Sequence, residues 1–325
     1  MVKSNGIPHK SLLWERVSIS PFLSPNPKSL AEEAVTTPDV LTWKDRLYLY
    51  VGAIKGGQER LLVTPLQPGW LDGKPPDSWA AGAEIAIDTG PHRFDRLHVF
   101  DPASLVVDDT VFLYYSAVGP EGDVLGMASS SDGVHFLKRE SPLLEGRAPE
   151  IIYFDGRYYL FYVKLTSRDG YAIFSSFSTD GEHFSPVSVA PVLDVGASGT
   201  WDGFEVTTPR IFQRSNTFYM LYSGGGDPAL KDIPQAFGLA RSSDLITWER
   251  YPGNPVFRKG IDGSWDDGAI WFGTVFAWED QLYLIYEGGS AEAIQEPGPA
   301  LTQVGLAAIA YDTFDTHMAL WTREG

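Results

Sequence analysis

The sequence predicts an all-β chain: a five-bladed β-propeller whose four-stranded antiparallel blades surround a central channel. Three observations support this prediction. A proline-led hairpin motif recurs five times, and a short serine–aspartate motif follows three of the hairpins. Helix signals are sparse, because the 325 residues include 33 glycines and 23 prolines and few windows keep apolar residues at helical spacing. Similar units repeated along a chain predict a ring or an array of blades.

The clearest hairpin covers residues 145–162. β-Branched and aromatic residues fill 151–154 and again 158–163. Asp155-Gly156 between them is a strong two-residue turn signal, because primed turns need positive φ and glycine supplies it without strain. Pro149 stands at the start of the first strand, where the missing N–H removes no ladder bond.

Four further copies begin near residues 37, 100, 207 and 271 and end on Tyr50, Tyr115, Tyr222 and Tyr286. The last copy has Gly273 where the others have proline. A single blade cannot bury both of its faces, so the five blades must pack against one another in one domain. We therefore expect one domain over 1–325, with blades starting near 37, 100, 148, 207 and 271, and at most a short helix over 29–34 before the first blade.

The second motif occupies residues 130–136, 178–184 and 242–248. Each copy has a small hydroxyl residue, an aspartate and an aromatic residue four places after the aspartate. We expect the aspartates to bond their own backbone in turns and the aromatic residues to pack between sheets. With this motif each unit holds about four strands, which is the size of a propeller blade.

Bulk composition excludes several classes of partner. The formal net charge is −17 and the acidic residues are scattered, which disfavours nucleic acid and anionic membranes but suits a neutral ligand such as a sugar. The chain has no cysteine, so disulfides, thiolate metal sites and cysteine nucleophiles are absent. It has no run of 18 apolar residues, so the sequence predicts no membrane-spanning helix. Residues 1–10 contain no apolar signal core, which predicts a cytoplasmic protein unless a signal has been removed. The oligomeric state stays open.

Four carboxylates lie close to the prolines that lead the blades: Asp39, Asp101, Glu150 and Glu205. The first strand of each blade lines the channel, so we expect these side chains to converge from different blades. Strand side chains alternate between faces with a period of two, which predicts a shared face for the first three and the opposite direction for Glu205. The competing interpretation is that they cap strand ends or pair with neighbouring groups.

Convergent carboxylates suit the hydrolysis of glycosidic bonds. One carboxylic acid protonates the leaving oxygen, and one carboxylate activates water or attacks the anomeric carbon. A third carboxylate nearby raises the pKa of the acid, because like charges resist ionising together.

The proline-led strand, the Gly156-Arg-Tyr-Tyr-Leu-Phe-Tyr162 hairpin and the serine–aspartate motifs resemble those of the five-bladed propeller glycosidases of families 43 and 32, with relatives in families 117 and 130. The resemblance covers residues 35 to 290. The family 43 pattern implies Asp39 as base, Glu150 as the residue that orients the acid, and Glu205 as acid. The family 32 pattern implies Asp39, Asp101 and Glu150 instead.

This chain departs from the family 43 motifs at two places. Family 43 has its base before the proline, where this chain has Thr37, and it has Glu-Gly-Pro at the acid, where this chain has Glu205-Val-Thr-Thr-Pro209. Family 43 usually has a histidine in the fifth blade near an axial ion or water. Residues 271–286 contain none, so we expect no required metal and no cofactor.

Other residues are candidates for substrate binding. Trp271 can stack on a sugar face, and Asp267 is a fifth candidate carboxylate. The basic residues Arg93, Arg96 and His98 precede Asp101 and can bind a phosphate or an acidic sugar, or pair with acidic groups of the protein. In contrast, Trp201 and Trp265, which stand in matching segments ahead of the fourth and fifth blades, are predicted to pack within the blades.

The sequence therefore predicts a glycoside hydrolase that inverts configuration and acts on terminal furanosyl or pentosyl residues of oligosaccharides. In this prediction Glu205 is the acid and Asp39 the base, and Glu150 and Asp101 tune them. Two alternatives stay open. One is a phosphorylase of the family 130 type, with Arg93, Arg96 and a histidine beside the pocket, and the other is a carbohydrate-binding propeller without catalysis.

Overall fold

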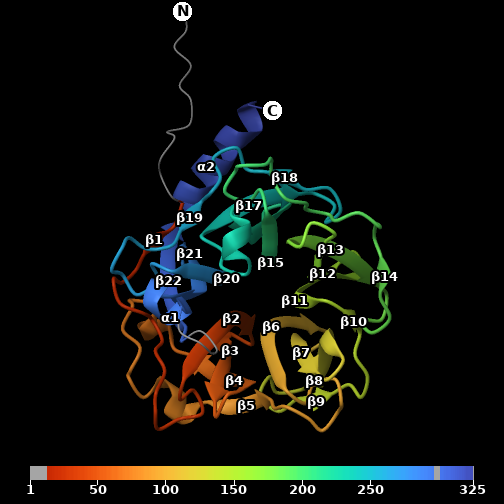
Figure 1. The fold of residues 1–325 in the computed structure, drawn as a ribbon, viewed down its shortest axis with the longest axis vertical. Helices are drawn as coiled ribbons and strands as arrows, with labels where there is room; N and C mark the ends of the chain where they lie inside the picture. Colours follow the sequence, from red (N-terminus) through yellow and green to blue (C-terminus); the bar gives the residue numbers. More distant parts are fainter. Residues whose placement is uncertain (1–12, 296–300, 325) are drawn as a thin grey trace, which may run out of the picture.

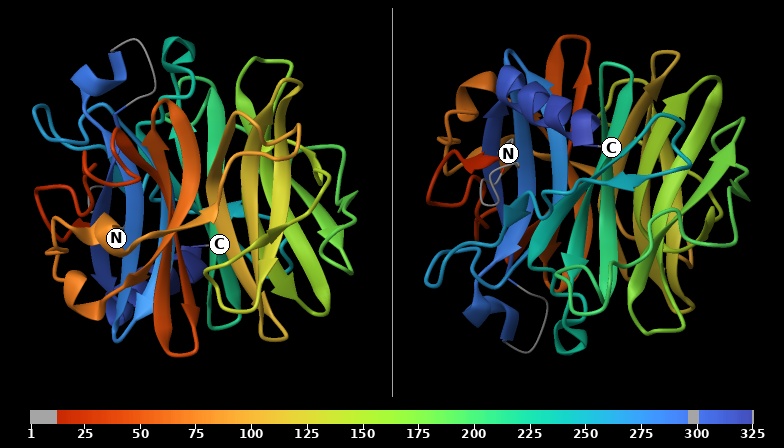
Figure 2. Two further views of the ribbon diagram at one scale, coloured as in Figure 1. Left: turned by 90° about the horizontal axis from the view of Figure 1, so that it is seen from below. Right: turned by 90° about the horizontal axis from the view of Figure 1, so that it is seen from above.

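The computed structural model describes residues 13–295 and 301–324. Five antiparallel sheets stand around a common axis, with the first strand of each nearest the axis (Figure 1). Seen from the side, the inner strands run along the axis and the connecting loops lie at both ends of the ring (Figure 2). The predicted five-bladed propeller is confirmed. Residues 1–10, in which the sequence showed no signal core, lie outside the described residues.

The strands of each blade follow the chain outward from the axis. Their bounds are β2 (Ala34–Trp43), β3 (Arg46–Lys55), β4 (Gln58–Leu66) and β5 (Glu84–Ile87) in blade 1; β6 (His98–Val107), β7 (Thr110–Gly119), β8 (Gly122–Ser130), β9 (Leu137–Lys138) and β10 (Leu144–Glu145) in blade 2; β11 (Arg147–Phe154), β12 (Arg157–Leu165), β13 (Tyr171–Ser178) and β14 (Ser185–Pro186) in blade 3; β15 (Glu205–Arg214), β16 (Thr217–Gly225), β17 (Ala236–Ser242), β18 (Glu249–Arg250) and β19 (Phe257–Arg258) in blade 4; and β20 (Ala269–Trp278), β21 (Gln281–Gly289), β22 (Gln303–Ala310) and β1 (Glu15–Arg16) in blade 5.

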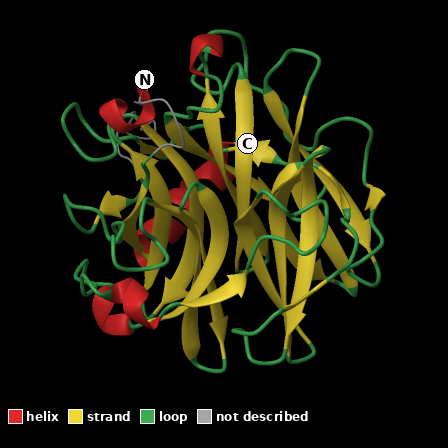
Figure 3. Cartoon of the chain, turned by 60° about the horizontal axis from the view of Figure 1, so that its bottom comes forward, coloured by secondary structure: helices red, strands yellow, loops and turns green. Residues whose placement is uncertain are grey.

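Helical segments are few in the part of the chain that the structure describes (Figure 3). They are the 3₁₀ turns at Pro68–Trp70, Trp79–Gly82 and Pro228–Leu230, and the helices α1 (Ala291–Gln295) and α2 (Tyr311–Glu324). The helix expected over 29–34 is absent, because β2 begins at Ala34 and turns precede it. Helix α2 was not predicted. It buries Phe314, Met318 and Trp321, a spacing of four and three residues that places them on one helix face.

The N-terminal strand closes the ring. β1 pairs with β22, so blade 5 takes its outermost strand from the start of the chain. The Arg16 guanidinium bonds the buried Asp266 carboxylate at 2.6 Å and the Tyr286 hydroxyl at 3.1 Å. Blade 4 has the same set of hydrogen bonds between Arg250, Asp202 and Tyr222. There all three residues come from one stretch of the chain, 202–250, and the N-terminal strand takes no part.

The serine–aspartate motifs join neighbouring blades. Asp132 Oδ1 accepts hydrogen bonds from the backbone N–H groups of Val134 and His135, as expected for a turn that bonds its own backbone. The Tyr50 hydroxyl of blade 1 donates to the Gly133 carbonyl of blade 2 at 2.8 Å. The aromatic residues of the three motifs lie 5.8–6.2 Å from aromatic rings of the preceding blades. The motifs are therefore part of the scaffold.

Candidate active site

A pocket of about 160 Å³ lies at the mouth of the channel and is called the axial pocket below. Its walls come from blades 2 to 5. The residues that line it are Asp101, Arg147, Ala148, Val163, Tyr171, Thr207, Thr208, Asp232, Trp271 and Phe272.

A β-bulge at the same place in every inner strand shapes this pocket. In β6 the register shifts between Phe100 and Ala103, and Asp101 adopts a φ of 55°. The equivalent residues of the other blades, Thr37, Ala148, Thr208 and Phe272, also have positive φ. A bulge inserts one extra residue and re-aims the side chain that it carries. The backbone of the bulge therefore places a carboxylate at the pocket in blade 2 alone among the five blades.

Asp101 is buried, with only 1% of its surface exposed. Its Oδ2 accepts hydrogen bonds from the Ser116 hydroxyl at 2.7 Å and from the Ala148 N–H at 3.2 Å. Its Oδ1 is buried without a hydrogen bond. Burial raises the pKa of Asp101 to about 6, although the nearby positive charge of Arg147 and the Ser116 bond act against the rise. A carboxylic acid of this pKa retains its proton near neutral pH far better than an ordinary aspartate.

Arg147 and Asp232 form the charged wall of the axial pocket. Arg147 Nη1 lies 3.7 Å from Asp232 Oδ2, and Nε lies 3.5 Å from Asp123 Oδ2. The guanidinium also donates to the Tyr171 hydroxyl and packs over the Phe100 ring. Arg147 is the one basic residue among the ten residues that line the pocket. The Asp232 side chain is half exposed, so substrate and water can reach its carboxylate.

Glu205 lies directly behind Asp232. It is fully buried, and its Oε1 accepts a hydrogen bond from the Asp232 N–H at 3.0 Å, whereas its Oε2 is buried without a partner. Burial and the neighbouring Asp232 charge raise its pKa to about 7. Glu205 is not among the residues that line the axial pocket, but it holds the backbone of one that is.

The expectation that Glu205 points away from the other carboxylates is wrong. Thr207 pairs with Ser223 and Arg210 with Leu221, so three residues of β15 match two of β16 across the bulge. The extra residue shifts the alternation by one place, and Glu205 and Arg210 share a face of β15. Asp39 and Glu150 occupy the register position of Arg210 in their own strands.

Asp39 and Glu150 lie in the layer of the channel that follows the bulge. Asp39 Oδ2 accepts bonds from the Ser104 N–H and hydroxyl at 2.9 and 2.5 Å, and Glu150 Oε1 accepts from the Ile211 N–H at 2.9 Å. Each carboxylate thus joins its blade to the next. Arg210, also buried, lies 3.4 Å from Glu150. Burial raises the pKa of Glu150 to about 8 and also raises that of Asp39, with Arg210 acting against both rises. Neither carboxylate lines the axial pocket.

Sequence reasoning missed two carboxylates near Asp101. Glu287 Oε2 accepts from the Thr37 N–H at 2.9 Å, and Glu59 accepts from the Thr36 hydroxyl. Burial raises their pKa values to about 7 and about 8, and the charge of Asp101 contributes to both. Glu287 had a signal, because it directly follows the closing tyrosine of the fifth hairpin, where the other copies have valine or serine. Glu59, which follows a Gly-Gly turn, had none.

The remaining candidates are dispersed. Trp271 lines the axial pocket, and its Nε1 donates to the Asp232 carbonyl at 3.0 Å. Asp267 accepts bonds from the N–H groups of Gly263 and Ala291, both at 2.7 Å, and so ties two loops together. It does not line the pocket.

The basic residues before Asp101 also lie outside the lining of the axial pocket. Arg93 is exposed and pairs with Glu121 at 2.8 Å, and Arg96 is exposed. His98 Nδ1 accepts a long bond of 3.4 Å from the Glu59 N–H. Over residues 13–295 and 301–324, no group of three or more histidine or carboxylate side chains has the arrangement of a metal site. In the same residues no helix has the length and apolar composition needed to span a bilayer.

Comparison with known proteins identifies the fold. No family model matches the chain, and no curated protein sequence does. Solved structures match over almost the whole chain. A glycosyl hydrolase from Bacteroides ovatus is 14% identical, with 95% of this chain and 96% of that chain covered and a TM-score of 0.71. A GH130 structure, from a family described as mannoside phosphorylases that contains glycoside hydrolases targeting β-1,2 mannosidic linkages in Candida mannan, is 15% identical, with coverages of 95% and 97% and a TM-score of 0.70.

A thermostable family-43 glycoside hydrolase is 18% identical, with coverages of 88% and 92% and a TM-score of 0.64. Families 43 and 130 are among those that the hairpin and serine–aspartate motifs resemble. At these identities the likeness establishes a shared fold, and the chain has the architecture of the propeller glycoside hydrolases.

Proposed function

We propose that the protein is a glycoside hydrolase that cleaves its substrate in the axial pocket, with Asp101 as the general acid. The observation that carries this proposal is the environment of Asp101: a buried carboxyl that lines the pocket, has a pKa of about 6 and has one oxygen without a hydrogen bond. A general acid works best when its pKa lies near the operating pH. The free oxygen is buried, and in this proposal the bound substrate must displace its cover before this atom passes the proton to the leaving group.

Asp232 is the proposed partner that activates water. It is the other carboxylate among the residues that line the axial pocket, and its side chain is half exposed. Glu205 and Trp271 fix its backbone from two sides, at 3.0 Å each. In this proposal Glu205 positions Asp232 and does not itself protonate the substrate. Asp39 and Glu150, expected from the sequence to take part in the chemistry, are proposed to hold neighbouring blades in register instead.

The proposed substrate is the terminal sugar of a neutral oligosaccharide, removed with inversion. A volume of about 160 Å³ is below the range of about 300–1,000 Å³ typical of ligand pockets, which supports one small unit and exo action on a furanose or pentose. Trp271 and Tyr171 supply aromatic surface beside the charged wall. Inverting enzymes hold their two carboxyl groups about 6.5–9.5 Å apart, which leaves room for a water molecule, whereas in retaining enzymes the two groups are only about 5 Å apart.

Phosphorolysis is the second candidate, and Arg147 is the observation that favours it. An arginine beside the acid is suited to bind an inorganic phosphate nucleophile. Arg147 is already flanked by Asp123 and Asp232, which repel an anion. Hydrolysis is therefore preferred over phosphorolysis.

The test is a panel of nitrophenyl glycosides and oligosaccharides, including arabinofuranosides, xylosides, fructosides and β-1,2-linked mannosides, assayed with and without inorganic phosphate. On the unactivated oligosaccharides, Asp101→Asn and Asp232→Asn should each lower kcat/KM by about 10²–10⁴, the usual contribution of an acid or base. Asp45→Asn, in an exposed hairpin turn, is the matched control and should have no effect.

Three results would contradict parts of this proposal. Full activity of Asp101→Asn on the unactivated oligosaccharides would remove the acid assignment. Activity that requires phosphate would show a phosphorylase, and binding without cleavage of any glycoside would show a carbohydrate-binding propeller. The anomeric form of the first product, followed by proton NMR, distinguishes inversion from retention.

A further inference from the structure

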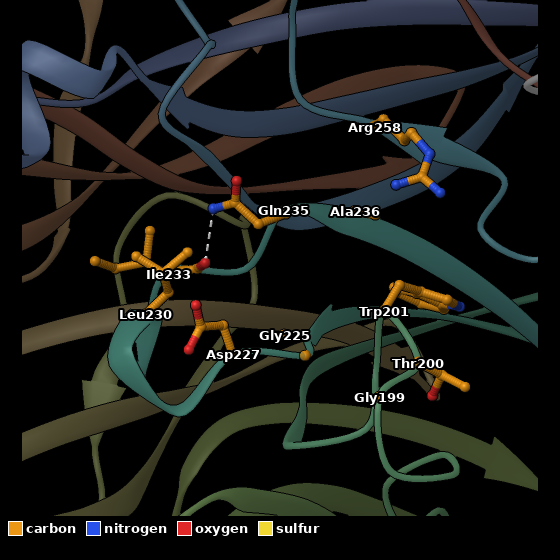
Figure 4. Close-up of a pocket in the computed structure, with 11 residues that line it drawn as sticks. Gly199, Thr200, Trp201, Gly225, Asp227, Leu230, Ile233, Gln235, Ala236 and Arg258 are labelled. Carbon is orange, nitrogen blue, oxygen red and sulfur yellow. Dashed lines mark hydrogen bonds between the residues drawn. The ribbon is translucent and has the colours of Figure 1, made fainter.

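A second pocket, of about 290 Å³, lies beside the axial pocket on blade 4 and is called the blade-4 groove below. Its walls include Trp201, Asp227, Leu230, Ile233, Gln235 and Arg258. Figure 4 shows Trp201 and Arg258 on one side and Leu230, Ile233 and Asp227 across from them. None of these residues lines the axial pocket.

The two pockets share a wall. Residues 226–235 connect β16 to β17, and within this loop Asp232 lines the axial pocket while Ile233, the next residue, lines the groove. Consecutive Cα atoms are about 3.8 Å apart, so adjacent residues of one chain segment separate the two pockets.

This wall is held on both flanks. Glu205 bonds the Asp232 N–H and Trp271 bonds the Asp232 carbonyl, as described above. On the side of the groove, the Gln235 amide donates to the carbonyls of Ile233 and Gly268, both at 2.9 Å. The wall is therefore a fixed partition, and a ligand that fills both pockets must pass over it.

Blade 5 provides an internal comparison. Trp265 lies over the ring of Tyr286 as Trp201 lies over Tyr222, with centroid distances of 5.8 and 5.6 Å. Next to Trp265, however, Ile294 of α1 packs against Gly268 so closely that no Cβ could be added there. Ile294 also lies against Gly289, whose counterpart on blade 4, Gly225, lines the groove instead. Blade 4 thus has a groove where its structural repeat carries a helix.

The lining of the groove has the mixed character expected for a sugar. The Trp201 indole is held nearly parallel to Tyr222, at an interplanar angle of 28°, so it is a rigid apolar surface. Asp227 and Arg258 are exposed and offer an acceptor and donors for hydroxyl groups. Pockets of this kind combine aromatic area with a few polar groups that fix the orientation of the ligand.

We propose that the blade-4 groove binds a second, neutral sugar unit of the glycan whose terminal unit occupies the axial pocket. This inference rests on the proposed glycosidase function. It predicts that oligosaccharides long enough to cross the partition bind more tightly than those confined to the axial pocket. A gain of tenfold corresponds to about 1.4 kcal/mol of binding free energy.

The test compares substrates of two to five units, using β-1,2-linked mannooligosaccharides and arabino-oligosaccharides, on the full chain. Leu230→Trp fills the groove, since Leu230 is an exposed wall residue in a loop. Val189→Trp adds the same ring at a position that is 99% exposed and does not line the groove, so it is the matched control. Arg258→Ala removes polar contacts without adding bulk, which keeps the test informative if Leu230→Trp folds poorly.

The expected result is that Leu230→Trp and Arg258→Ala raise KM for the longer substrates about tenfold and leave nitrophenyl monosaccharides unchanged, while Val189→Trp changes neither. Equal kinetics for long and short substrates in the native protein, or identical kinetics in all variants, would overturn the groove assignment while leaving the axial site intact. Absence of cleavage of every glycoside would instead contradict the proposed function. In that case, calorimetric titration with the same oligosaccharides decides whether Leu230→Trp weakens binding.

Discussion

The buried carboxylate of Glu287 allows a direct test of the electrostatics around Asp101. Only 6% of Glu287 is exposed, its Oε2 accepts a hydrogen bond from the Thr37 N–H at 2.9 Å, and burial raises its pKa from 4.5 to about 7. The perturbation is Glu287→Gln, which keeps an oxygen acceptor for Thr37 and cannot ionise.

The magnitude follows from linkage between protonation and folding. The pKa of Glu287 is higher in the folded than in the unfolded chain, so its protonated form contributes to the free energy of unfolding. This contribution is fully present below pH 4.5 and is lost as the pH rises through 7. A difference between 4.5 and 7, at about 1.4 kcal/mol per pKa unit, corresponds to about 3 kcal/mol. The variant has no such loss. Its free energy of unfolding relative to the native protein should therefore increase by about 2–3 kcal/mol between pH 5 and pH 8.

The assay is urea unfolding followed by circular dichroism at half-unit steps from pH 5 to pH 8. Glu140→Gln, at an exposed position, is the control and should follow the native protein at every pH. A constant difference between Glu287→Gln and the native protein over this range would refute the reasoning, because it would mean that Glu287 ionises equally easily in the folded and unfolded chains.

Three further predictions concern ring closure, blade packing and catalysis. Arg16→Met leaves a buried carboxylate unpaired where the N-terminal strand closes the ring, so the free energy of unfolding in urea should fall by about 3 kcal/mol, and no loss would contradict the closing role. Gly238→Ala should cost about 1–3 kcal/mol, because the new Cβ would lie 2.5 Å from the Tyr222 ring, whereas Gly82→Ala, which meets nothing within 4 Å, should change the melting temperature little. For an unactivated oligosaccharide, the value of kcat/KM should fall about tenfold per pH unit above about pH 6, as Asp101 loses its proton, and a flat profile from pH 5 to pH 8 would contradict its role as acid.

The blade architecture could be predicted because its signals are local. The Asp155-Gly156 turn and the leading Pro149 fix a hairpin from a few adjacent residues, and five such hairpins define the ring. The closing strand at Glu15–Arg16 could not be predicted, since two residues carry no pattern and their partner β22 lies almost 300 residues away. Helix α2 could have been predicted, because Phe314, Met318 and Trp321 recur at the spacing of one helix face. It was overlooked because the rest of the chain is dominated by strand patterns.

The site was harder to predict, because a β-bulge adds one residue to a strand. Beyond the bulge, odd or even spacing in the sequence no longer tells on which face of the strand a side chain lies. Asp101 carries the bulge itself, Asp39 and Glu150 follow it, and Glu205 precedes it. Residues that look equivalent beside their prolines therefore lie at different levels of the channel. Asp232 had no motif at all, since it belongs to a loop that only the fold brings to the pocket.

The most direct test of the central claim, that Asp101 protonates the leaving group in the axial pocket, is a comparison of leaving groups. The ratio of kcat/KM between the native protein and Asp101→Asn is measured on a dinitrophenyl glycoside, whose leaving group needs no proton, and on an unactivated oligosaccharide of the same sugar. The proposal predicts a ratio near one for the activated substrate and about 10²–10⁴ for the oligosaccharide. An equal loss on both substrates would contradict it, because the carboxyl would then serve a step other than proton donation.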